Sequence, residues 1–466
     1  MPQIIISFIA TFEKKGALKV QLDLLKDSPK GLFFRYLVPS VGATMVTSIY
    51  LLADSIMIGK GLGDVAIAAL NLLLPIFNIL FGTGALFGVG GGVLFSVSMG
   101  NHDPLRAKKY FSLALLLNTG FMLFYLISGI LFFTPILKFL GATAVTMPDA
   151  HEYAFWVLFG VPCFTFSTFL QAVVRNDKDP NLAMVAVMTG GILNIILDWI
   201  FIFPLDWGMA GASIASVIGS SVSCLILCTH FFKKSSQLKF SLHAIRPRYA
   251  GEIFGYGFSS FFMEISNGLI IFVFNIQALR YAGELGVTVL SILSNTAYMV
   301  TSLSNGIAQA AQPLMAVNFG AGLTERIKKF RKYGLITETF EGLGFALVGF
   351  FIPLAVIYAF LNPSQTVLDM APDAVRFYFI SFLCLPLNIF FINYFQAILK
   401  PKQAMAVCAL RGLILGVSFA LILPTFLGIT GLWLAMPLAE GLTLLISWIM
   451  KQKTGIDLLS DNHQNN

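Results

Sequence analysis

Charged side chains are scarce in this sequence. They make up 11% of the 466 residues, while apolar residues make up 57%. An ordinary globular protein contains about 25% charged residues. A soluble protein of this length could not cover its surface with so few charges, so the composition excludes that class and indicates a membrane protein.

Cysteines and enzyme signatures are also few. The five cysteines lie in or beside apolar segments without the paired spacing of metal ligands, which indicates neither a disulfide framework nor a zinc site. No Gly-Lys-Ser/Thr follows the glycine-rich stretch 82–92, His151-Glu152 lacks the second histidine of a zinc protease, and no Gly-x-Ser-x-Gly occurs. We therefore expect no enzyme and no cofactor, and we attribute the glycines to close helix packing.

A basic patch of the kind that binds nucleic acid is missing as well. The formal net charge is +7, but the basic residues are spread among short loops. This distribution argues against nucleic acid as a partner.

Long apolar segments are what the sequence does contain. Each reaches or exceeds the roughly 20 residues with which a helix spans a bilayer, so we predict an all-α polytopic membrane protein whose partner is the lipid bilayer. The twelve predicted spans are 32–58, 65–99, 111–139, 153–174, 181–203, 208–232, 253–281, 287–319, 333–361, 375–399, 404–427 and 431–450.

The basic residues predict how the chain is oriented. Twelve spans place both chain ends on one side of the membrane, and only Lys60, Lys138, Arg280 and Arg376 fall on the opposite side. By the positive-inside rule we expect both termini in the cytoplasm, with the protein in the inner (plasma) membrane of a bacterium. The apolar run 4–10 has no basic residue before it, which is unlike a secretory signal.

An internal repeat appears when the sequence is shifted by 220 positions. Gly100, Arg106, Lys108, Lys109 and Tyr110 then align with Gly320, Arg326, Lys328, Lys329 and Phe330. Each repeat holds six spans, an even number, so the two lobes are predicted to be related by a pseudo-two-fold axis along the membrane normal.

The repeat also predicts the domain organisation. We expect a cytoplasmic lead-in at 1–31, an N-lobe at 32–232, a linker at 233–248, a C-lobe at 249–451 and a cytoplasmic tail at 452–466. Two such lobes are typical of a transporter that works by alternating access, and a channel or a scaffold is the alternative.

Acidic side chains inside the spans are the candidate functional residues. An ionisable group in the middle of a bilayer costs about 2.5 to 3.5 kcal/mol on insertion scales, so it needs a partner or a wet cavity. Asp198 follows Asn194 by four residues, which places both on one helix face. Asp54 lies within another span. Neither aspartate has an acidic counterpart in the repeat, which a purely structural role would not predict.

Other polar residues in the spans are weaker candidates. Tyr50 precedes Asp54 by one helical turn and either hydrogen-bonds it or is an ordinary packing aromatic. Glu264 and Glu440 also lie within spans, and Glu440 is expected to snorkel or pair near a helix end. Two carboxylates with amide and hydroxyl oxygens suit a proton or a sodium ion equally well.

Several stretches resemble the multidrug and toxic compound extrusion (MATE) family. They are Pro39, the run Tyr-Leu-Leu-Ala-Asp-Ser-Ile-Met-Ile-Gly at 50–59, Ala-Ile-Ala-Ala at 66–69, Gly100 with its basic loop, Asn-Ile-Ile-Leu-Asp at 194–198 and Gly-Met-Ala-Gly-Ala at 208–212. The resemblance covers residues 32–450. It implies an antiporter that expels amphipathic, mostly cationic drugs and toxic compounds against a sodium or proton gradient.

The resemblance also implies roles for particular residues. Asp54 matches the first-helix aspartate of the family's N-lobe cation site, and Asn194 and Asp198 match its fifth-helix pair. Ser216 falls where prokaryotic members often place a threonine ligand. Glu264 is similar to the seventh-helix acid of members whose cation or drug site lies in the C-lobe, so the lobe that holds the main coupling site stays open.

A monomer is expected, with no metal beyond sodium at the N-lobe residues and no cofactor. The runner-up function is a flippase for a lipid-linked precursor, from the same broader superfamily. A flippase would prefer basic residues along its cavity to hold pyrophosphate, whereas the basic residues here lie near the ends of the spans.

Overall fold

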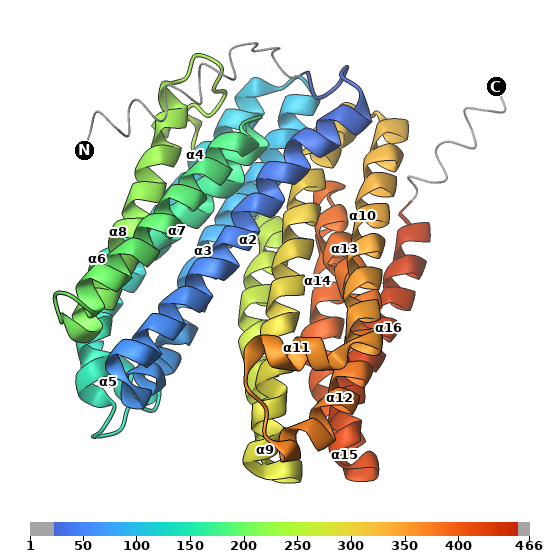
Figure 1. Ribbon diagram of the computed structural model, residues 1–466. Coiled ribbons are helices and arrows are strands. Elements are labelled where there is room, and N and C mark those ends of the chain that lie inside the picture. The colour runs from blue at the N-terminus through green and yellow to red at the C-terminus, as the bar shows by residue number, and fades with distance from the viewer. Residues whose placement is uncertain (1–22, 455–466) are drawn as a thin grey trace.

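The computed structural model describes residues 23–454, and every regular element in this part of the chain is a helix (Figure 1). The N-lobe helices are α2 (Pro29–Leu62), α3 (Asp64–Gly100), α4 (Pro104–Leu131), α5 (Phe133–Phe139), α6 (Met147–Asn176), α7 (Pro180–Ile202) and α8 (Gly208–Cys228). The 3₁₀ turns η1 (Thr229–Phe232), η2 (Leu242–Ala244) and η3 (Pro247–Tyr249) follow in the linker.

The C-lobe contains the remaining elements. They are α9 (Ala250–Gly320), α10 (Thr324–Phe351), α11 (Pro353–Phe360), α12 (Gln365–Phe379), η4 (Ile380–Leu383), α13 (Leu385–Ala397), α14 (Pro401–Ala409), the π-helical turn η5 (Leu410–Ile414), α15 (Leu415–Leu427) and α16 (Ile429–Gln452). The predicted all-helical membrane fold is confirmed. Most of the predicted lead-in and tail lies outside the described residues.

The number of spans depends on how α9 is counted. Within the described residues, 11 helices are long and apolar enough to cross a membrane, and one of them includes all 71 residues of α9. A straight helix of that length would extend about 1.5 Å per residue and would far exceed the roughly 30 Å core of a bilayer. Gly283 has φ +60° and ψ −151°, which interrupts the helix. The two halves of α9 correspond to the predicted spans 253–281 and 287–319, so twelve crossings result.

An aspartate cap explains why α4 starts earlier than predicted. The Asp103 carboxylate accepts a hydrogen bond from the Arg106 backbone N–H at 2.9 Å, and Pro104 occupies the first turn of α4. Asp179 caps α7 in the same way, with Pro180 behind it. An aspartate cap followed by proline begins a helix before its apolar run, so α4 starts at Pro104 instead of 111.

Glycines bring the helices close together, as predicted. At every glycine between 82 and 92, another helix lies within 3.0 Å of the position that a Cβ would take. Gly84 and Gly88 face α6, Gly91 faces α4, and Gly90 faces the first turn of α9 in the other lobe. A side chain larger than hydrogen would therefore separate these helices.

The two lobes meet through α2 and α3 of the N-lobe and both halves of α9. Gly257 on α9 abuts the Leu86 carbonyl on α3, and Gly306 lies against Val41 and Thr44 on α2. The start of α2, the linker and the end of α16 lie at one end of the molecule, which we call the linker end (Figure 1). The ribbons of the two lobes diverge toward the opposite end (Figure 1).

Candidate functional site

The crossing of α7 and α8 forms one wall of the N-lobe site. Gly190 and Gly219 lie face to face, and the carbonyl oxygen of each is 2.6 to 2.7 Å from the Cβ position of the other. This close approach brings Asn194, one turn after Gly190, into contact with Ser216, one turn before Gly219. The Asn194 side-chain nitrogen donates a hydrogen bond to Ser216 Oγ at 3.3 Å.

Helix α2 closes the site from the other side. Gly191 on α7 packs against the Tyr50 ring, with 3.0 Å between its Cβ position and Tyr50 Cδ1. Asp54 lies one turn after Tyr50 and comes within hydrogen-bonding range of Asp198. The structure thus brings together the Asp54, Asn194, Asp198 and Ser216 side chains that the sequence analysis singled out.

Oxygens that lack a donor are the main chemical feature of this site. Asp54 is 5% exposed and Asp198 is 0% exposed. Among the described residues, no hydrogen-bond partner reaches Asp54 Oδ1, Asn194 Oδ1 or either carboxylate oxygen of Asp198. Buried acceptors are normally paired, so four such atoms at one place indicate a missing positive charge or proton.

The donor set fits a hard cation or a proton. Carboxylate, amide and hydroxyl oxygens are the ligands that hard cations prefer, and a single proton between two carboxylates would also relieve their repulsion. No cluster of three or more His, Cys, Asp or Glu side chains that could hold a metal ion occurs in the described part of the chain.

Tyr153 on α6 is a site residue that the sequence analysis missed. It is 1% exposed, and its phenol interacts with Asp54, Asp198 and Ser216. Nothing in the local sequence connects this tyrosine to one acid 99 residues earlier and another 45 residues later. Its position at the start of an apolar span was the one available signal.

The family model MatE matches residues 39–200 and 260–422. The chain belongs to the MATE family. It is 26% identical over 435 residues to the multidrug export protein MepA of Staphylococcus saprophyticus, covering 92% of this chain and 95% of that protein. It is also 25% identical over 430 residues to MepA of Staphylococcus aureus, covering 90% of this chain and 94% of that protein.

Solved structures support the fold. The chain superposes with a TM-score of 0.87 on a multidrug resistance MATE family transporter of the MOP superfamily in an outward-facing conformation. That match covers 94% of this chain and 98% of the other at 24% identity. A MOP superfamily transporter from Pyrococcus furiosus gives a TM-score of 0.85 at 24% identity, covering 93% of this chain and 98% of the other. This protein is accordingly a multi-pass membrane transporter with the two-lobe MATE fold.

Glu264 lies apart from the N-lobe site of this MATE protein. Its Cβ is 3.5 Å from the Cβ position of Gly82, so it stands where the first half of α9 meets α3. Tyr298, on the second half of α9, interacts with both Glu264 and Tyr50. The sequence analysis missed this tyrosine, which links the two lobes and is 45% exposed.

Glu440 forms an ion pair inside the C-lobe. Its Oε1 accepts hydrogen bonds from Arg411 Nε at 3.0 Å and Nη2 at 2.8 Å, and its Oε2 accepts one from Asn388 at 2.7 Å. Glu440 therefore pairs, as one of the two expectations had it, but it does so in the middle of α16 and not near a helix end. The partner, however, lies in a buried π-helical turn, since Arg411 belongs to η5.

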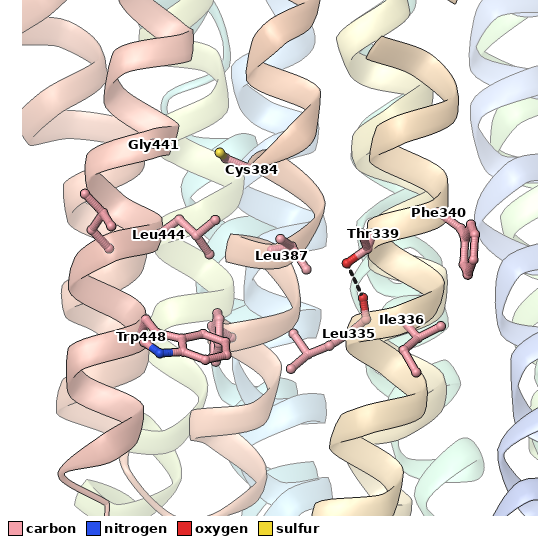
Figure 2. Close-up of a pocket in the computed structure, with 11 residues that line it drawn as sticks. Leu335, Ile336, Thr339, Phe340, Cys384, Leu387, Gly441, Leu444 and Trp448 are labelled. Atoms are coloured by element: carbon pink, nitrogen blue, oxygen red, sulfur yellow. Dashed lines mark hydrogen bonds between the residues drawn. The ribbon is translucent and has the colours of Figure 1, made fainter. Parts of the chain in front are cut away.

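An apolar groove on the surface of the C-lobe is unrelated to these acids. It has a volume of about 610 Å³ and is lined by apolar residues of α10, α13 and α16, among them Leu335, Leu444 and Trp448 (Figure 2). Phe340 at its edge is 72% exposed. None of the predicted site residues lines it.

Proposed function

We propose that this protein is a cation-coupled antiporter, driven by sodium or protons, that exports amphipathic, mostly cationic drugs and toxic compounds by alternating access. The observation that supports this most directly is the set of buried acceptor oxygens on Asp54, Asp198 and Asn194 that have no donor among the described residues. The curated relatives at 24 to 26% identity are named multidrug export proteins, which supports the substrate class.

Helix α2 is the element that couples ion binding to movement of the lobes in this proposal. It carries Asp54 in the ion site, and two to four turns earlier Val41 and Thr44 contact Gly306 of the C-lobe. A cation or proton between Asp54 and Asp198 would hold α2 against α7. Its loss would leave two like charges in a dry site, and their repulsion would displace α2 together with the lobe contact.

The direction of transport follows from the charge distribution. With the termini and the linker in the cytoplasm, the end at which the lobes meet faces inward and the divergent end faces out (Figure 1). A cation entering along the membrane potential gains about 2.3 kcal/mol per charge per 100 mV, which favours export of the drug. We propose that the protein acts as a monomer in the plasma membrane of a bacterium.

The flippase alternative gains no support from Arg411, a buried basic residue of the C-lobe. A lipid pyrophosphate would require guanidinium or ammonium groups that are available to it. Arg411 is buried and is engaged on two nitrogens by Glu440.

The proposal is tested by measuring drug affinity against cation concentration in the purified protein. We expect the apparent affinity for a fluorescent lipophilic cation to change steeply with sodium or pH in the wild type and to become independent of both in Asp198→Asn. Asp206→Asn is a matched control, because Asp206 is exposed just after α7. An unchanged dependence in Asp198→Asn would remove this site from the mechanism.

A further inference from the structure

A second pair of carboxylates lies inside the C-lobe on α10. Glu338 and Glu341 are separated by one helical turn and lie on the same face, where their carboxyl groups interact. Glu338 is 0% exposed. Ser304, from the second half of α9, is also fully buried and donates a hydrogen bond to Glu341 Oε1 at 3.0 Å.

These carboxylates lack the donors that buried acids normally have. Within residues 23–454, neither oxygen of Glu338 has a hydrogen-bond partner, and Glu341 Oε2 has none. No lysine, arginine or histidine of this region forms an ion pair with either glutamate. Among these residues the Ser304 hydroxyl is the one donor that reaches the pair, and its single proton is shared between Glu341 Oε1 at 3.0 Å and the Val300 carbonyl at 2.9 Å.

Charged groups on the elements packed around α10 are directed elsewhere. Arg331, two turns earlier on α10, donates from Nη1 to the Tyr394 hydroxyl of α13 at 3.1 Å. Arg376 on α12 pairs with Asp373 at 3.0 Å. On α2, Lys30 and Arg35 are exposed. On the side of α10 that packs against α13, Gly334 contacts the apolar ring of Phe390.

The repeat shows that a packing role does not require acids at these positions. Shifted by 220 residues, Glu338 aligns with Asn118 and Glu341 with Phe121, both on α4. Asn118 is likewise 0% exposed and has no partner on either side-chain atom within the described residues. A neutral amide thus occupies the equivalent place in the N-lobe, and only the C-lobe has introduced charge there.

We propose that Glu338 and Glu341 form a second ion-binding site, which holds one proton between their carboxylates with the Ser304 hydroxyl as an additional donor. Two ionised carboxylates cannot share an apolar interior without a counter-charge, because both the desolvation and the mutual repulsion are unfavourable. A single proton neutralises one acid and supplies the hydrogen bond that the other lacks. Two carboxylates and a serine also occur in the N-lobe at Asp54, Asp198 and Ser216, although there the serine accepts a hydrogen bond from Asn194.

The position of this site connects it to the contact between the lobes. Ser304 precedes Gly306 by two residues, and Gly306 lies against Val41 and Thr44 of α2. Loss of the proton would separate Glu338 from Glu341 and change how α10 holds α9 at this contact. Proton binding itself does not depend on the proposed antiport function, whereas its contribution to transport rests on that function.

Infrared spectroscopy of the purified protein tests proton binding directly. At neutral pH we expect the protonated-carboxyl absorption of the wild type to lose one component in Glu338→Gln and in Glu341→Gln, since a neutral amide replaces the shared proton, while any component from Asp54 and Asp198 remains. Glu325→Gln is the control, because Glu325 lies on the same helix but is exposed and pairs with Lys328. Identical spectra for the wild type and both glutamate variants, or loss of bound sodium in place of the carboxyl band, would show the proposal to be wrong.

A transport measurement then separates this site from the N-lobe site. In proteoliposomes we expect Glu338→Gln to keep exporting drug while fewer protons are exchanged per drug molecule than in the wild type. An unchanged ratio, with the infrared band lost, would refute the contribution of this site to coupling. If the wild type transported no drug at all, the proposed antiport function would fail while the infrared result would stand.

Discussion

Gly100 at the end of α3 and Gly320 at the end of α9 are 220 residues apart in the sequence and lie against each other's helices across the lobe contact. Gly100 abuts the Val317 carbonyl, and Gly320 abuts the Val97 carbonyl. The contact is therefore symmetric, since Val97 and Val317 are also related by the repeat. No side chain fits at either glycine while the lobes stay together at the linker end.

Gly320→Ala is predicted to weaken closure at this end. Overpacking a tight contact costs about 1 to 3 kcal/mol, which would shift the two-state equilibrium between closed and open lobes by roughly 5- to 150-fold. Spin labels on the two lobes, with distances measured by pulsed electron paramagnetic resonance, would report a larger fraction with the linker end open. Gly344→Ala is the control, because nothing lies within 4 Å of its Cβ position. An identical distance distribution for both variants would contradict the proposed contact.

The Arg411–Glu440 pair is predicted to contribute to stability, not to coupling. Glu440→Gln leaves the Arg411 guanidinium buried without its counter-charge, a change that typically costs about 3 to 5 kcal/mol. The melting temperature of the purified protein should therefore fall, and the double variant Arg411→Met/Glu440→Gln should recover part of the loss. Glu325→Gln at an exposed pair should change it little, since such pairs contribute about 0 to 1 kcal/mol. If Glu440→Gln abolished the ion dependence of drug exchange and left the melting temperature unchanged, this assignment would be wrong.

The start of the linker is predicted to loosen in acid. Burial raises the pKa of Asp179, but hydrogen bonds from His230 at 3.2 Å and Lys233 at 2.7 Å outweigh it and lower that pKa to about 2. An aspartate with a depressed folded-state pKa stabilises the fold above its unfolded pKa of about 3.9, and this stabilisation disappears as the pH falls toward 2. The protection of the backbone amides at 233–237 against hydrogen exchange, relative to their intrinsic rates, should fall over that window in the wild type. In Asp179→Asn this protection should already be low at neutral pH; wild-type protection there would contradict the role of this carboxylate.

Tyr153→Phe is predicted to weaken ion binding while the fold is retained. The phenol lies near both acids and hydrogen-bonds Ser216 of the N-lobe site, and a hydrogen bond contributes about 0.5 to 1.5 kcal/mol, or roughly two- to tenfold in affinity. The sodium or proton concentration that half-saturates drug exchange should rise by that factor. Tyr125→Phe is a comparison at a tyrosine that bonds Thr83 at 2.9 Å outside the site. Equal effects of the two substitutions would argue against a special role for Tyr153.

Much of the architecture followed from the sequence because hydrophobic length and charge are local properties. The twelve spans, the two lobes and the grouping of Asn194 with Asp198 depend on helical spacing and on the repeat. The pairing of Asp54 with Asp198 depends on the angle at which α2 crosses α7, which is set by contacts such as Gly191 against Tyr50. Spacing alone could not predict that angle.

The residues that the sequence analysis missed are the ones positioned only by tertiary packing. Tyr153 and Tyr298 look like ordinary aromatics of apolar spans until α6 and α9 are placed beside the acids. Arg411 lies inside the predicted span 404–427 and was not singled out, yet it is 6% exposed and paired inside the lobe. Burial of this kind cannot be predicted from a window of sequence.

Dye efflux from proteoliposomes, with a sodium gradient and a pH gradient imposed separately, tests the central claim most directly. We predict that one of the two gradients drives export by the wild type and by Asp206→Asn, and that neither drives it in Asp198→Asn. Efflux that is insensitive to both gradients, or that persists unchanged in Asp198→Asn, would contradict an antiporter coupled through the Asp54–Asp198 site.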